Sequence, residues 1–100
     1  MLFRSASGFG TSPSIVTGTS NAFSINVGTG GTANSGVITM PTSSNGWTCS
    51  AINSINPSSS NTIAVPTSSS SITLQNYGRT TGTLTAWAAS DVITVSCTGY

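Results

Sequence analysis

Residues 71–97 read SITLQNYGRTTGTLTAWAASDVITVSC, and apolar side chains alternate with polar ones in three parts of this segment. The alternation runs through Ser71–Asn76, Thr83–Trp87 and Val92–Cys97. Successive side chains of a β-strand leave opposite faces of the sheet, so a strand with one buried face has this period of two. The segment therefore predicts three strands and an all-β fold.

Outward from this segment, four more short apolar runs are bounded by turn residues. They are expected to be strands at Ala22–Val27, Gly36–Met40, Trp47–Ile52 and Thr62–Val65. About seven short strands with Gly, Pro, Ser and Asn turns, and no helical pattern, are typical of a small antiparallel β-sandwich, a jelly roll or a barrel. The order of the strands is left open by the sequence.

Residues 1–20 are expected to form an extended N-terminal arm, and residues 21–100 a single β domain. Glycines and a proline interrupt any regular pattern in the first twenty residues. The arm is too apolar for a solvated tail, which favours an arm that becomes ordered against a partner, although a frayed terminus is the alternative. Removing it is then expected to abolish attachment and preserve the fold. The candidate partner-binding residues are Leu2, Phe3, Phe9, Ile15 and Val16.

The composition of the chain is almost free of charge. Only 3% of the 100 residues are charged, with a net charge of +1, against roughly 25% in ordinary soluble domains. Such a surface gives little repulsion between copies, so we expect a homo-oligomer or a part of a larger assembly; a Ser/Thr-rich secreted domain is the alternative. Arg4 and Arg79 are too few cations for nucleic-acid binding, and no apolar run approaches the ~20 residues of a membrane span.

Catalysis is excluded by the residue types that the chain lacks. It has one carboxylate, Asp91, and no His, Lys or Glu, so acid–base catalysis, paired carboxylates and a Ser-His-Asp arrangement have no basis. We expect a non-enzymatic protein without catalytic residues, metal or cofactor. Asp91 is expected to accept backbone N–H groups in its turn, or to form an exposed ion pair with Arg79 worth under about 1 kcal/mol. Trp47 and Trp87 are interpreted as core or interface anchors, with sugar stacking as the alternative.

Cys49 and Cys97 are the two cysteines of the chain. Two buried free thiols are one interpretation, in keeping with synthesis in a cytoplasm. A disulfide between strands is the other, and it would stabilise the fold by roughly 4 kcal/mol. A metal site is excluded because no His or further Cys completes a coordination shell.

Two segments of the chain resemble a module in small virion proteins of tailed bacteriophages. The first is PTSSNGWTCSAI, residues 41–52, and the second is the segment 71–97. The module pairs an N-G-W-x-C strand with a late A-W-x-A-S-D-V/I strand that ends in Cys. The residues that carry this pattern are Asn45, Gly46, Trp47, Cys49, Ala86, Trp87, Ala89, Ser90, Asp91, Val92 and Cys97.

This resemblance implies a structural role in a virion and no catalytic residues. We expect a capsid decoration or cement protein, made in the host cytoplasm and assembled as a trimer, that binds the outer shell between subunits of the major capsid protein. The N-terminal stretch lacks the continuous apolar segment of a secretory signal, in keeping with that localisation. The alternative is a tail fibre, spike or other tail component that binds a host receptor through its loops, at Gly28–Thr32, Asn53–Asn61 and Tyr77–Gly82.

Overall fold

The structure is a computed structural model that describes residues 5–18 and 22–100, with the side chains of residues 16–18 outside the description. Within these ranges the chain forms eight strands and no helix. In chain order the strands are β1 (Ser5–Ser7), β2 (Ser14–Gly18), β3 (Ala22–Asn26), β4 (Ser35–Thr39), β5 (Trp47–Asn53), β6 (Ser60–Ser68), β7 (Ser71–Gly78) and β8 (Val92–Gly99).

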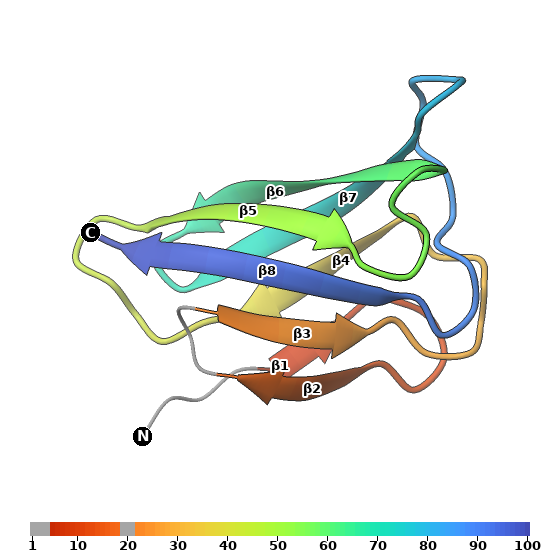
Figure 1. Ribbon diagram of the computed structural model, residues 1–100. Coiled ribbons are helices and arrows are strands. Elements are labelled where there is room, and N and C mark those ends of the chain that lie inside the picture. Colours follow the sequence, from red (N-terminus) through yellow and green to blue (C-terminus); the bar gives the residue numbers. More distant parts are fainter. Residues whose placement is uncertain (1–4, 19–21) are drawn as a thin grey trace.

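The described strands form a sandwich of two antiparallel sheets, which confirms the predicted fold class. One sheet has the order β1-β4-β7-β6 and the other β2-β3-β8-β5, and Figure 1 shows them as two packed layers. Consecutive strands β2–β3 and β6–β7 pair with each other, whereas the other connections cross between the sheets. Four crossing connections gather at one end of the sandwich, here called the loop end: residues 8–13, 27–34, 54–59 and 79–91.

The core lies between the two sheets and follows the predicted alternation. In β7, Ile72 and Leu74 are fully buried, and in β8, Ile93 and Val95 are fully buried. The side chains between them face outward, as the period of two requires. The remaining buried apolar residues are Phe9, Phe23, Ile25, Val27, Ile38, Met40, Trp47, Trp87 and Cys97.

The predicted strand Thr83–Trp87 is wrong. This segment forms only an isolated bridge between Leu84 and Tyr77, and its backbone is otherwise irregular. The reason is topological, because the chain must leave β7 in one sheet and enter β8 in the other. Trp87 closes the loop end: its backbone N–H donates to Ala33 O (2.9 Å) and its indole N–H to Thr62 Oγ1 (3.2 Å).

The predicted N-terminal arm does not hold for residues 5–18. β1 pairs with β4 and β2 pairs with β3, so this segment supplies an edge strand to each sheet. Phe9, between the two strands, is 1% exposed, and its ring packs on Trp87 with 5.3 Å between ring centroids. A truncation of residues 1–20 would therefore remove part of the fold, and it cannot test attachment.

Candidate ligand groove at the loop end

A shallow groove with a volume of about 440 Å³ lies on the described surface. It lies where β6 and β7 reach the loop end, beside the turn after β7 that projects from the sandwich in Figure 1. The residues that line it are Asn61, Ile63, Tyr77, Gly78, Arg79 and Gly82. The groove therefore combines an aromatic ring, an amide and a cation, beside strands whose described residues carry no charge.

The register of β6 and β7 brings the groove residues together. Asn61 lies directly opposite Tyr77, and Ile63 follows on the same face of β6. Their neighbours Thr62 and Asn76 are buried, so alternation turns the side chains of Asn61, Ile63 and Tyr77 outward, away from the core.

Arg79 joins two loops at this groove. Its side-chain Nε–H donates to Pro57 O (2.8 Å), and its backbone N–H donates to Ser59 O (3.3 Å). Two of the loops predicted to meet a receptor, Asn53–Asn61 and Tyr77–Gly82, are thus side by side. Asn61 and Ile63 were not singled out from the sequence; the alternation of β6 indicates that they face outward, but only the strand pairing places them beside Tyr77.

Asp91 is buried, so the predicted exposed ion pair with Arg79 is wrong. Asp91 is 2% exposed, and its Oδ2 accepts bonds from Ala88 N (2.9 Å) and Asn53 Nδ2 (2.8 Å). Its Oδ1 accepts a bond from Asn56 Nδ2 (2.6 Å). The predicted backbone bond in the turn is confirmed, and the carboxylate also ties the β5–β6 loop to the β7–β8 loop.

The five candidate partner-binding residues do not form one exposed surface. Phe9 is in the core, and Ile15 is partly buried against the core. Leu2 and Phe3 lie outside the described residues, as does the side chain of Val16. Phe9 is therefore not available to a partner, and a contact surface has to be sought elsewhere.

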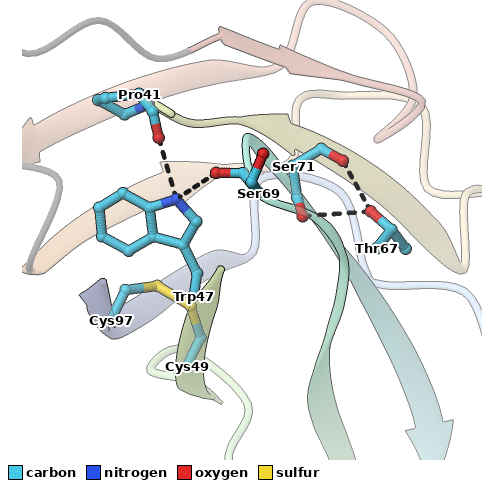
Figure 2. The surroundings of a disulfide bond; sticks show 7 residues. All are labelled: Pro41, Trp47, Cys49, Thr67, Ser69, Ser71 and Cys97. Atoms are coloured by element: carbon cyan, nitrogen blue, oxygen red, sulfur yellow. Dashed lines mark hydrogen bonds between the residues drawn. A yellow bond between two sulfur atoms is a disulfide. The ribbon is translucent and has the colours of Figure 1, made fainter. Parts of the chain in front are cut away.

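Cys49 and Cys97 form a disulfide, which decides between the two interpretations that the sequence left open. They lie opposite each other on β5 and β8, with a Cα–Cα distance of 4.1 Å, close to that of a non-hydrogen-bonded antiparallel pair. In Figure 2, Trp47 lies beside this bond, and its indole N–H donates to the carbonyl oxygens of Pro41 (3.0 Å) and Ser69 (3.1 Å).

Both tryptophans are buried, at 6% exposure for Trp47 and 1% for Trp87. Their interpretation as core anchors is confirmed, and neither can serve as an exposed sugar-stacking platform. Tyr77 is the aromatic residue that lines the groove instead.

Among the described residues, no three His, Cys, Asp or Glu side chains lie together in a way that could hold a metal ion. The same residues contain no helix long and apolar enough to cross a membrane. No protein-family model, curated protein or solved structure matches the chain.

Proposed function

We propose that this protein is a non-enzymatic structural protein of a tailed-phage virion that decorates the capsid. It binds the outer shell between subunits of the major capsid protein. The resemblance of residues 41–52 and 71–97 to phage virion proteins supports this role. The observation that carries it is the outer face of the sheet β1-β4-β7-β6, whose described strand residues include no charged side chain.

That face exposes aliphatic side chains among hydroxyl groups. Val37, Ile63 and Val65 are 39%, 42% and 37% exposed. Val37 and Val65 both lie opposite Thr73, so they flank the central strand β7 in one row across the sheet. Exposed apolar groups gathered in this way mark interaction surfaces more often than isolated ones do. This face replaces the N-terminal segment as the proposed contact with the shell.

The disulfide also supports a role outside a reducing cytoplasm. Disulfides persist in secreted proteins and on virion surfaces, and are rare where thiols are kept reduced. A decoration protein made in the host cytoplasm would meet oxidising conditions once the particle is released. Cys49 and Cys97 are already opposite each other in the sheet, so the bond can close without rearrangement of the fold.

The test is attachment of purified protein to expanded heads of the phage that encodes it, measured by co-sedimentation. Val37→Lys and Val65→Lys are expected to reduce attachment at least ten-fold, because each would place a charge in the buried contact. Thr94→Lys, on the outer face of β8 in the opposite sheet, is the matched control and is expected to attach normally. Normal attachment of both valine variants would refute the assignment of this face.

A tail fibre or spike component is the second candidate, favoured by the groove at the loop end. Two of the loops expected to meet a receptor are joined there by Arg79. Binding of the purified protein to host cells and not to heads would favour this candidate. A homotrimer is predicted for either role, and light scattering across a concentration series measures the solution mass that would establish it.

A further inference from the structure

We propose that the groove binds an acidic saccharide, a sugar ring that carries a carboxylate. Arg79 holds the carboxylate, the ring of Tyr77 packs against the sugar face, and the amide of Asn61 bonds a hydroxyl group. This inference does not depend on attachment to a capsid. It names the ligand class for the second candidate function, and it can be tested on the isolated protein.

The distribution of charge limits the ligands that this surface attracts. Of the described residues only Arg79 and Asp91 have side chains that carry a formal charge at neutral pH. Asp91 is 2% exposed and bonded to two amides and a backbone N–H. Arg79 is therefore the one charged side chain exposed on the described surface, and it lies in the groove. A ligand that is attracted to this surface by charge is an anion that meets Arg79.

The guanidinium of Arg79 is held in place before a ligand arrives. Its Nε–H donates to Pro57 O at 2.8 Å, while none of the described residues accepts a bond from its terminal nitrogens. Arginine binds carboxylates through two parallel N–H···O bonds, which add both strength and orientation. Anchoring at Nε lowers the entropy lost when those bonds form.

The other groove residues favour a sugar over a peptide. Tyr77 offers an aromatic face and Asn61, directly opposite on β6, offers an amide that both donates and accepts hydrogen bonds. Ile63 is the only aliphatic residue of the lining, so the groove has no apolar pocket for a peptide side chain. A volume of about 440 Å³ lies within the range of small-ligand sites. The space beside Gly82 is open, because a Cβ added there would meet nothing within 4 Å.

The test is a titration of ¹⁵N-labelled protein with sodium glucuronate, followed by amide chemical shifts at constant ionic strength. We expect a Kd on the order of 1–10 mM for one sugar ring, with shifts centred on residues 61–63 and 77–82. Glucose, which lacks the carboxylate, is expected to bind at least ten-fold more weakly. Tyr77→Phe is expected to bind like the parent protein, and Tyr77→Ala at least five-fold more weakly.

Arg79→Gln is expected to weaken glucuronate binding at least ten-fold, and Arg79→Lys several-fold, because lysine keeps the charge and loses the planar fork. Arg4→Gln makes the same change in net charge at a residue that has no part in the proposal, and it is expected to bind normally. The amide spectrum of each variant reports whether the fold is preserved.

Four results would overturn the proposal. The first two are no shifts up to about 50 mM glucuronate, a generous limit for a specific site, and binding of glucose as tight as that of glucuronate. The other two are an equal loss of binding in Arg79→Gln and Arg4→Gln, and tighter binding of inorganic phosphate or of an Asp/Glu hexapeptide at the same residues. The last would assign the groove to a simple anion or to an acidic protein segment. Attachment to heads is tested separately through Val37 and Val65, which do not line the groove, so failure of one proposal can be told from failure of the other.

Discussion

Replacing Phe9 by Ala is expected to lower the free energy of unfolding by about 3–5 kcal/mol. Phe9 is 1% exposed, so the substitution removes a complete ring from the core. About 0.5–1.5 kcal/mol of the loss is the aromatic contact with Trp87, whose centroid is 5.3 Å away. The ring also lies against Gly36, where an added Cβ would be 2.5 Å from it. Because Gly36 has no side chain to fill the space, a cavity would remain.

Urea unfolding measures this loss, with tryptophan fluorescence as the signal. For a urea dependence of about 1–3 kcal/mol/M, the midpoint is expected to fall by at least about 1 M. Ile55→Ala is the matched control, since Ile55 is 57% exposed and its truncation is expected to change stability by no more than about 0.5 kcal/mol. If Phe9→Ala were as mild as this control, the integration of residues 5–18 into the sandwich would be refuted.

The remaining predictions use the same unfolding assay. Gly36→Ala is expected to cost about 1–3 kcal/mol, because its methyl group overlaps the Phe9 ring; a neutral result would mean that the ring shifts freely. Asp91→Asn is expected to lower the free energy of unfolding by about 1–3 kcal/mol. The NH₂ of the new side chain would face a group that donates to the carboxylate, such as Asn56 Nδ2. Unchanged stability would contradict the burial of that carboxylate. Reducing the Cys49–Cys97 bond, with a sequence separation of 48, is expected to cost about 4 kcal/mol. The double Ala variant should not respond to reductant, and equal stability of oxidised and reduced protein would contradict the prediction.

The strands that the sequence predicts best are those with one face in the core. The alternation of β7 and β8 appears in both the sequence and the burial pattern, because packing and strand geometry require the same period. In β6 the strand continues through Pro66 to Ser68, beyond the predicted end at Val65. β6 is an edge strand, where a residue without an N–H group is tolerated.

The sequence is a poor guide where the chain leaves or enters a sheet. Leu84 and Ala86 alternate like strand residues, yet both are exposed in an irregular segment whose buried residue is Trp87. β1 has three residues and β2 contains a register shift between Ile15 and Thr17. In strands so short or so irregular, the sequence shows no alternation of apolar and polar residues. Their position is determined by pairing with a neighbouring strand.

The candidate groove also depends on strand pairing that the sequence does not specify. Tyr77 and Arg79 are neighbours in sequence, but Asn61 joins them only through the pairing of β6 with β7, and Pro57 through its bond to Arg79. The sequence predicted these loops as receptor contacts of a tail component, but it did not predict that they lie side by side. Whether they meet depends on strand order, which residue chemistry does not specify.

Salt separates the two proposed contacts, because one is uncharged and the other depends on a cation. The outer face around Val37 and Val65 contains no charged side chain among the described residues of its strands. Attachment through it is expected to change little between 50 mM and 500 mM NaCl, a range that shortens the Debye length from about 14 Å to about 4 Å. Binding of glucuronate at the exposed Arg79 should weaken several-fold over the same range. Attachment to heads that falls steeply with salt would place Arg79, and not the valine face, at the shell.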